Sequence, residues 1–370
     1  MSGVVVTVDY DAISANVAAL KARATPADVI AVVKANAYGH GLVESARAAR
    51  AGGAGWLGVA QVDEALALRA AGDTGRILAW LYGPATPLQP LVAADVDVAV
   101  SSLDDLDALL SAGDSAGSSP RVHVCVDTGL GREGVTPDEL PALLDAVATA
   151  VAAERAVPAG LWSHLAWADA PGHPTIDEQA TAFESALAQA TERGLAFEVR
   201  HLANSAAALT RPDLRYDLVR PGIAVYGLPP VPDEAGAAFG LTPAMSVTSV
   251  VALVKRVPTG HGVSYGHDYV TDRDTYLGLV AAGYADGVFR SAGGRAEVAI
   301  RGERYRIAGR VCMDQFVVDL GPETSVEAGD TVTLIGPNGP TAREWANAAG
   351  TIDYEIVCRF GGNREVTGRS

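Results

Sequence analysis

The stretch Ala31-Val-Val-Lys34-Ala-Asn-Ala-Tyr38-Gly39-His40-Gly41 ends an apolar run with a lysine and continues into a glycine-containing loop. The run predicts a buried β-strand with Lys34 at its carboxyl end. An ammonium group there is costly to desolvate unless it is paired or neutralised. Burial lowers the pKa of a lysine, and the neutral amine attacks aldehydes, so the position suits Schiff-base chemistry. A lysine paired with a carboxylate is the alternative.

Similar apolar runs recur through the first two-thirds of the chain, separated by segments of helical length. Strands buried on both faces of a parallel sheet have this nearly continuous apolar character. Eight of them favour a (β/α)8 barrel over an open doubly wound sheet, and active sites of such barrels lie at the carboxyl ends of the strands. The expected strands are Val29–Lys34, Trp56–Ala60, Arg76–Leu81, Asp97–Val100, Arg121–Asp127, Gly160–His164, Phe197–Leu202 and Leu218–Tyr226. The expected helices are Asp11–Arg23, Gln61–Ala71, Leu103–Ala112, Pro137–Ala153 and Asp177–Arg193.

The composition of the sequence changes at Pro229-Pro-Val-Pro-Asp233, a proline-rich stretch that predicts a linker. We expect an α/β fold of two domains, a (β/α)8 barrel at residues 1–232 and a mainly β domain at residues 233–370. One helix, Ala342–Ala349, interrupts the later strands. Those strands are expected at Ser246–Val254, Thr275–Ala281, Glu297–Ile300, Gln315–Leu320 and Thr331–Ile335.

Composition excludes several classes of protein. The 370 residues include 28 basic and 44 acidic side chains, a net charge of −16, which argues against a nucleic-acid or anionic-membrane surface. No apolar run reaches the ~18 residues of a membrane span, and the N-terminus has no secretory pattern. Cys125, Cys312 and Cys358 are too scattered for a disulfide framework or a zinc site, and no metal motif is present. A cytoplasmic enzyme is expected.

Polar clusters follow several of the expected barrel strands. Ser163-His164, Asn204-Ser205 and Arg220-Pro-Gly222-Ile223 all fall at carboxyl ends. Barrels often bind phosphate with the loops after strands seven and eight, and a hydroxyl with backbone N–H groups is suited to it. An imine-forming lysine and a phosphate site at one barrel mouth together indicate pyridoxal phosphate.

One motif suggests a different cofactor. Gly129-x-Gly131-x-x-Gly134 follows a strand and precedes a helix, and Glu154 lies 20 residues beyond, as in the dinucleotide-binding fingerprint. The motif stands in the middle of the eight strands, and its acidic residue ends a helix, so nucleotide binding is disfavoured.

Two loops of the β domain contain candidate site residues. They are Val263-Ser-Tyr265-Gly266-His267-Asp268-Tyr269 and Arg310-Val-Cys312-Met313-Asp314-Gln315. A tyrosine in a glycine-flanked loop often serves only turn packing. Near cations, however, the phenol pKa of ~10 can fall enough for it to act as a base.

Over nearly its whole length the sequence resembles the pyridoxal-phosphate-dependent alanine racemases. The most specific match is the stretch at residues 31–41. The resemblance implies a barrel and a β domain in a head-to-tail homodimer with shared active sites. Supporting motifs are Val126-Asp-Thr-Gly-Leu-Gly-Arg132, His201-Leu-Ala-Asn-Ser-Ala206, Val219-Arg-Pro-Gly-Ile-Ala-Val-Tyr-Gly227, Val263-Ser-Tyr-Gly266, Gly283-Tyr-Ala-Asp-Gly287 and Ile352-Asp-Tyr-Glu355.

The resemblance implies roles for individual residues. Lys34 would form the imine with the cofactor and act as the base on one face of the substrate α-carbon. Tyr265 of the partner subunit would be the base on the opposite face, as racemisation requires. His164 would hydrogen-bond the cofactor or Tyr265, and Arg132 and the backbone at Met313 would contact the substrate carboxylate. The matching phosphate-binding positions are Tyr38, Ser205, Gly222, Ile223 and Tyr354.

Arg220 matches the residue that faces the pyridine nitrogen in this family. A guanidinium keeps its protons, so it leaves that nitrogen unprotonated and the carbanion less delocalised. This disfavours decarboxylation, for which a carboxylate is expected at the same position.

One position departs from the family pattern. Many members have a carbamylated lysine where this chain has Cys125, whose thiol cannot carry a carbamate. We hypothesise that a bound anion such as chloride, Asp127 or another carboxylate takes its place beside Arg132. The alternative is that the arginine tolerates the loss.

The leading interpretation is an enzyme that interconverts L- and D-alanine and supplies D-alanine for peptidoglycan. A racemase for serine or for a broader set of amino acids is the nearest alternative, because Cys125 and Met313 could alter the fit of the substrate. A decarboxylase on the same fold and a non-catalytic cofactor-binding protein are more distant alternatives.

Overall fold

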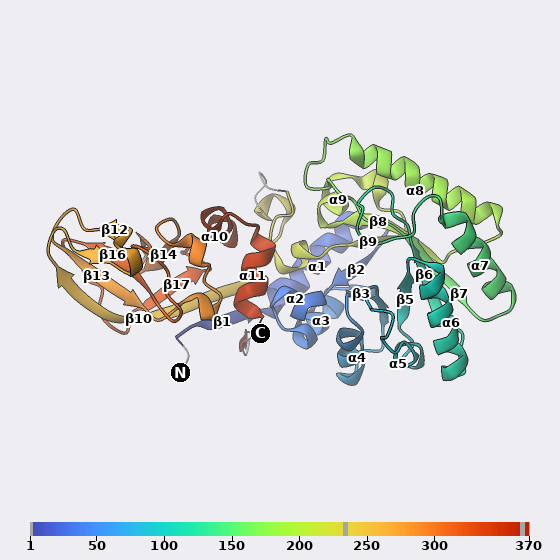
Figure 1. The fold of residues 1–370 in the computed structure, drawn as a ribbon, viewed down its shortest axis with the longest axis horizontal. Helices are drawn as coiled ribbons and strands as arrows, with labels where there is room; N and C mark the ends of the chain where they lie inside the picture. The colour runs from blue at the N-terminus through green and yellow to red at the C-terminus, as the bar shows by residue number, and fades with distance from the viewer. Residues whose placement is uncertain (1–2, 232–235, 363–366, 370) are drawn as a thin grey trace. The chain divides into compact units, whose positions relative to one another are not determined.

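The computed structural model describes residues 3–231, 236–362 and 367–369 (Figure 1). Its internal contacts divide the chain into two compact units. The barrel unit comprises Asp11–Ala37 and Leu42–Thr242, and the β unit comprises Met1–Tyr10, Tyr38–Gly41 and Pro243–Ser370. The boundary expected between residues 232 and 233 lies outside the described residues and stays a prediction.

The barrel unit contains a closed barrel of eight parallel strands in sequential order, which confirms the expected fold class. Its central positions are buried throughout, as strands covered on both faces require. The strands are β2 (Asp28–Val32), β3 (Trp56–Val59), β4 (Arg76–Ala79), β5 (Asp97–Val100), β6 (Arg121–Cys125), β7 (Val157–Trp162), β8 (Val199–Asn204) and β9 (Leu218–Arg220).

Helices connect the strands, as the blue-to-green part of Figure 1 shows. The sequence patterns predict five of them and miss four, which have at most ten residues and so give little periodicity. The helices are α1 (Tyr10–Ala24), α2 (Lys34–Tyr38), α3 (Leu42–Ala51), α4 (Val62–Ala70), α5 (Gln89–Ala93), α6 (Leu103–Ala116), α7 (Leu140–Ala152), α8 (Thr175–Glu192) and α9 (Ser205–Thr210).

Several expected strands extend too far, and two of these differences bear on the site. The first ends at Val32, so Lys34 begins a turn rather than ending the strand. The last ends at Arg220, and the apolar residues Ile223–Tyr226 form a 3-10 helix. Apolar composition alone cannot distinguish a buried strand from a buried helical turn.

The β unit contains an eight-stranded sheet in which antiparallel pairs predominate. The sequence predicts β10, β13, β14, β16, β17 and helix α10, but misses β1, which pairs with β10, and helix α11. The elements of this unit are β1 (Val5–Asp9), β10 (Met245–Val257), β11 (Gly262–Val263), β12 (Tyr269–Val270), β13 (Thr275–Val280), β14 (Glu297–Ile300), β15 (Glu303–Arg306), β16 (Phe316–Gly321), β17 (Thr331–Ile335), α10 (Ala342–Ala349), α11 (Asp353–Gly361) and β18 (Thr367–Arg369).

Candidate active site

Lys34 opens a turn whose backbone is left-handed. Ala35, Asn36 and Ala37 have φ of 55°, 53° and 55°, and Tyr38 has φ of 52°. A left-handed helical conformation costs roughly 1–2 kcal/mol per L-residue, so the turn stores strain. Such strain persists only where the surroundings enforce it, and it gathers at functional sites.

Hydrogen bonds within the barrel unit hold this strained turn. The N–H of Ala35 donates to Oε1 of Glu64 at 2.6 Å, and the N–H of Leu42 donates to Oδ1 of Asn36 at 2.9 Å. Nζ of Lys34 lies 5.7 Å from the centroid of the Trp80 ring. The lysine is therefore fixed at the carboxyl end of the barrel, where active sites of this fold lie.

Three cations gather around His164 at the same mouth of the barrel. The pKa of the His164 imidazole lies well below its ordinary value, first because of burial and then because of the charges of Arg220, Arg132 and Lys34. The imidazole is therefore neutral at pH 7. A site lined by three cations and a neutral imidazole suits a ligand that carries more than one negative charge.

Arg220 is buried and held from several sides. Its Nη1 donates to Nδ1 of His201 at 2.8 Å, and its Nη2 donates to the carbonyl of Ser163 at 2.5 Å and to Nδ1 of His164 at 3.2 Å. The guanidinium carbon lies 4.7 Å from the centroid of the Trp162 ring. Burial lowers the pKa of Arg220 to about 10, so the group is still a cation at pH 7.

Ser205 links the ends of β8 and β9. Its buried hydroxyl accepts hydrogen bonds from the N–H groups of Gly222 at 2.8 Å and Ala224 at 3.4 Å. Because the oxygen accepts both bonds, the hydroxyl proton can donate to an anion. The chain at Gly222–Ile223 follows β9 directly, where barrels commonly bind phosphate.

Arg132 is paired with the carboxylate of its neighbour Glu133. Both Nε and Nη2 of the arginine donate to it, the second at 2.7 Å. Asp127 accepts instead from the N–H groups of Gly129 and Gly131, at 2.9 and 3.1 Å, and so shapes the loop after β6. The structure thus places a carboxylate other than Asp127, that of Glu133, beside Arg132.

Cys125 is buried at the end of β6. Burial, followed by the charge of Glu133, raises the pKa of its thiol. The thiol is neutral at pH 7 and adds no charge beside Arg132. The glycine motif at residues 129–134 forms the loop between β6 and α7 of the closed barrel, which is not the open sheet of a dinucleotide-binding fold.

Two further candidates, Tyr38 and Tyr354, lie together in the β unit. Their ring centroids are 6.2 Å apart. A close approach of backbones fixes this pair, since a Cβ at Gly39, whose φ is +81°, would lie 2.5 Å from the carbonyl oxygen of Val357 in α11. Larger residues at position 39 would separate α11 from the turn that carries Tyr38.

Tyr265 lies on an exposed and strained loop of the β unit. The residue before it, Ser264, has φ of 63° and ψ of −172°, a region that L-residues other than glycine rarely occupy. The hydroxyl of Ser264 donates to the carbonyl of Arg310 at 2.8 Å. This bond connects the loop to the one that carries Met313. The side chains of Tyr265 and Met313 are 71% and 54% exposed in the isolated chain.

The structure brings the predicted residues together in two sets. The barrel unit gathers Lys34, Arg132, His164, Ser205 and Arg220 with the backbone at 222–223, and the β unit holds Tyr38 with Tyr354 and the loops of Tyr265 and Met313. The sequence assigns no role to Glu64, Glu133 or His201. His201 begins the family motif at residues 201–206, which marks it as a candidate site residue. The two glutamates stand in no such motif.

Within the parts of the chain that the structure describes, no group of three or more His, Cys, Asp or Glu side chains could hold a metal ion. Among these same residues, no helix has the length and apolar character needed to cross a membrane.

Comparison with known proteins gives one consistent family. Residues 8–230 match the alanine racemase N-terminal domain, and residues 244–367 match the alanine racemase C-terminal domain. The chain is 54% identical over 354 residues to the alanine racemase of Mycobacterium avium, covering 95% of this chain and 91% of the relative. It is 52% identical to that of Salinispora arenicola, covering 97% of this chain and 96% of the relative.

Solved structures agree with this result. The alanine racemase from the D-cycloserine-producing Streptomyces lavendulae superposes with a TM-score of 0.98 at 49% identity, covering 100% of this chain and 98% of the other. The alanine racemase of Streptomyces coelicolor A3(2) gives a TM-score of 0.97 at 48% identity with the same coverage. The chain belongs to the alanine racemase family, whose members interconvert L-alanine and D-alanine.

Proposed function

We propose that this racemase uses pyridoxal phosphate and two bases, Lys34 and Tyr265 of the partner subunit. The observation that carries the proposal is the gathering of Lys34, Arg132 and Arg220 around His164 at the carboxyl end of the barrel. A primary amine among cations is what an aldehyde cofactor with a phosphate, together with an amino-acid carboxylate, requires.

The donor set fits the cofactor. Lys34 Nζ would bond its aldehyde carbon, and the Ser205 hydroxyl and the N–H of Ile223 would bind its phosphate. The N–H of Gly222 donates to the Ser205 oxygen, so it could bind phosphate only by giving up that hydrogen bond. The phenols of Tyr38 and Tyr354, which lie together in the β unit, would add two more donors for phosphate. Arg220, still a cation at pH 7, would donate to the ring nitrogen and leave it unprotonated.

The cofactor, when bound, withdraws electrons from the substrate α-carbon and so makes its proton acidic. Arg132 and the backbone at Met313 would orient the substrate carboxylate. Lys34 would remove or deliver the α-proton on one face, and Tyr265 would do so on the other. His164, which accepts from Arg220 at Nδ1 and therefore carries its proton on Nε2, would act as a donor to the cofactor or to the Tyr265 phenolate.

A homodimer with shared sites follows from this assignment. The exposure of Tyr265 and Met313 supports it, because large side chains left exposed in one subunit are often covered by another. The expected location is the cytoplasm, and the expected use of D-alanine is peptidoglycan synthesis.

The experiment is the absorbance spectrum of the purified protein before and after borohydride, followed by chiral analysis of alanine, serine and other amino acids. We expect a visible band that borohydride removes, a covalent adduct at Lys34, and racemisation of alanine above the others. Lys34→Ala should lose the band, and an unchanged spectrum in that variant would refute the lysine assignment. Faster racemisation of serine would move the substrate assignment to the nearest alternative.

A further inference from the structure

Four buried polar side chains form a continuous line through the inside of the barrel. Asp97 is the first residue of β5, His123 lies in the middle of β6, His201 lies within β8, and Arg220 is the last residue of β9. The line therefore runs from the amino end of the strands to the carboxyl end. Oδ2 of Asp97 is 2.9 Å from Nε2 of His123, Nδ1 of His123 is 3.1 Å from Nε2 of His201, and Nδ1 of His201 is 2.8 Å from Nη1 of Arg220.

One arrangement of protons satisfies all three contacts. A guanidinium can only donate, so Nδ1 of His201 is an acceptor and the proton of this neutral imidazole is on Nε2. That N–H donates to Nδ1 of His123, whose own proton is then on Nε2 and donates to Asp97. If Asp97 instead donated to Nε2 of His123, the proton of His123 would be on Nδ1 and would donate to Nε2 of His201. Both nitrogens of His201 would then be acceptors, and that imidazole would have no proton. Asp97 is therefore the acceptor at the end of the line, and each of the three hydrogen bonds is donated in the direction from Arg220 to Asp97.

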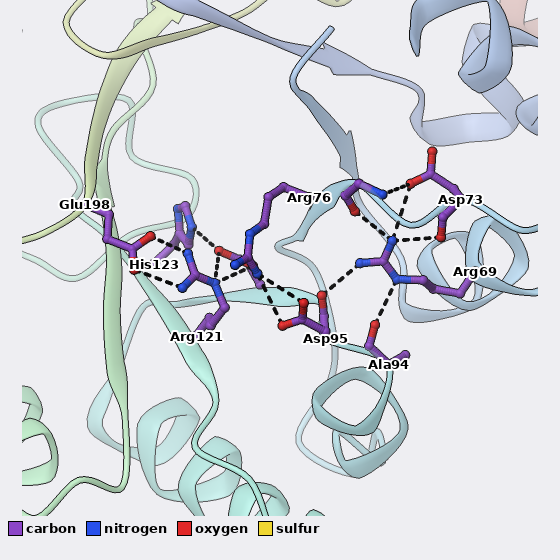
Figure 2. Close-up of polar contacts among 10 residues, drawn as sticks. Arg69, Asp73, Arg76, Ala94, Asp95, Arg121, His123 and Glu198 are labelled. Carbon is purple, nitrogen blue, oxygen red and sulfur yellow. Dashed lines mark hydrogen bonds and ion pairs between the residues drawn. The ribbon is translucent and has the colours of Figure 1, made fainter.

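The far end of the line is anchored by ion pairs at the opposite mouth of the barrel. Nε of Arg121 lies 3.1 Å from Asp97, and Nη1 of Arg76 lies 3.6 Å from it. Arg121 also pairs with Glu198, and Arg76 with Asp95, as Figure 2 shows. These arginines place positive charge beside the Asp97 carboxylate and fix its position as the acceptor for His123.

The barrel interior is shaped around the two imidazoles. A Cβ at Gly160 in β7 would lie 2.2 Å from Nδ1 of His123, so a larger residue there would collide with the ring. The Trp162 ring stacks on His201 with an interplanar angle of 8°, and the Trp56 ring meets His123 edge-on at 5.6 Å. Apolar contacts thus exclude water, and in such surroundings aligned hydrogen bonds strengthen one another.

We infer that Asp97 and His123 are positioning residues for Arg220. Through His201 they fix the tautomer that can accept from the guanidinium, and so hold Arg220 where it donates to the ring nitrogen of the cofactor. The inference rests on the proposed function. In histidine generally, the hydrogen bond made by one ring nitrogen decides whether the other nitrogen carries the proton.

The first test reads the tautomers directly. In the holoenzyme labelled with 15N-histidine, NMR spectra should show His123 and His201 neutral and protonated at Nε2 alone. A His201 protonated at Nδ1, or a charged His123, would overturn the inference. This readout does not depend on turnover.

The second test uses a pair of variants at one position. His123→Phe keeps a ring but removes both the donor and the acceptor, whereas the amide of His123→Gln can supply one of each. With cofactor labelled by 15N at the ring nitrogen, we expect His123→Phe to change the ring-nitrogen chemical shift and to lower kcat/KM by about 10–100-fold, as loss of a supporting hydrogen-bond partner does. His123→Gln should restore most of both.

Asp73→Asn is the matched control. Asp73 is a little-exposed carboxylate that pairs with Arg50 and Arg69 and lies outside the line from Asp97 to Arg220. Its variant should leave the ring-nitrogen shift unchanged. If His123→Phe does not fold, Gly160→Ala replaces it, because the added methyl group collides with the His123 ring.

An unchanged ring-nitrogen shift in His123→Phe or Gly160→Ala, whatever the loss of stability, would show that the line only fills the core and would overturn the inference. Absence of a bound cofactor in the wild-type protein would instead refute the proposed function. The histidine spectra distinguish the two failures, because the tautomers of His123 and His201 can be read in either case.

Discussion

Glu133 supplies the carboxylate that pairs with the guanidinium of Arg132, with Nη2 of the arginine 2.7 Å from Oε1. The arginine side chain is 56% exposed and the glutamate 23%, so solvent partly screens the pair. Removing the charge of Glu133 should loosen the orientation of Arg132 towards the substrate carboxylate.

We therefore expect Glu133→Gln to raise the KM for alanine about two- to fivefold, the effect of a partly exposed ion pair, with a smaller change in kcat. Steady-state kinetics in both directions measure it. Glu139→Gln, an exposed acid at the start of α7, is the control and should leave KM unchanged. Equal kinetics for the two variants would show that Glu133 does not orient Arg132.

The left-handed turn after Lys34 depends on Asn36. Its Oδ1 accepts from the N–H of Leu42 at 2.9 Å, and asparagine tolerates positive φ better than most residues. Asn36→Ala should lower the free energy of unfolding by about 1–2 kcal/mol and weaken cofactor retention. Urea unfolding and dialysis against cofactor-free buffer test both effects.

Asn36→Asp, which keeps an acceptor oxygen at the same place, should retain most of the stability and the cofactor. If alanine and aspartate variants lose cofactor equally, the hydrogen bond to Leu42 does not maintain the turn.

Acid should destabilise the protein through two buried imidazoles. Burial, followed by the charge of Arg220, holds the pKa of both His164 and His201 well below the ordinary 6.5. When the pH falls below about 6.5, the unfolded chain binds protons that the folded protein does not. Stability is therefore complete above that pH and falls by up to about 1.4 kcal/mol per pH unit for each imidazole as the pH decreases towards the folded-state pKa values.

Urea midpoints measured from pH 7.5 to pH 5 at fixed cofactor concentration check this dependence. His164→Asn removes one of the two imidazoles and should have a shallower slope over the same range. A wild-type slope of zero between pH 6.5 and pH 5 would contradict the assignment of neutral histidines.

Shared active sites predict complementation between inactive subunits. Lys34→Ala and Tyr265→Phe should each be nearly inactive, the second with unequal losses of α-proton exchange for the two enantiomers. Dissociated and reassociated together, they form heterodimers in which one site has both bases. We expect recovery of roughly a quarter of wild-type activity, since about half the dimers are mixed and half of their sites are complete.

The control is each variant taken alone through the same dissociation and reassociation. No recovery in the mixture would place Lys34 and Tyr265 of a single chain in the same site.

The sequence predicts the eight barrel strands because buried parallel strands are apolar along their whole length. This pattern can be recognised in each strand without knowing which elements pack against it. It misses α11, which carries Tyr354, and the turn after Lys34. A stretch such as Lys34-Ala-Asn-Ala-Tyr38 has no glycine before position 39, and Asn36 alone does not predict four successive residues with positive φ. Only contacts from other elements, such as that of Glu64 with Ala35, make this conformation stable.

The sequence by itself determined the alternation of strands and helices, the second β-rich part, and the residue types that bind an aldehyde and a phosphate. Tertiary structure alone decided which charges meet. The pairing of Arg132 with Glu133, the pKa of His164 and the line from Asp97 to Arg220 all depend on distances between side chains. Closure of the barrel brings together positions as far apart in the sequence as 123 and 201. Electrostatic and hydrogen-bond energies depend on separation in space, which the order of residues does not specify.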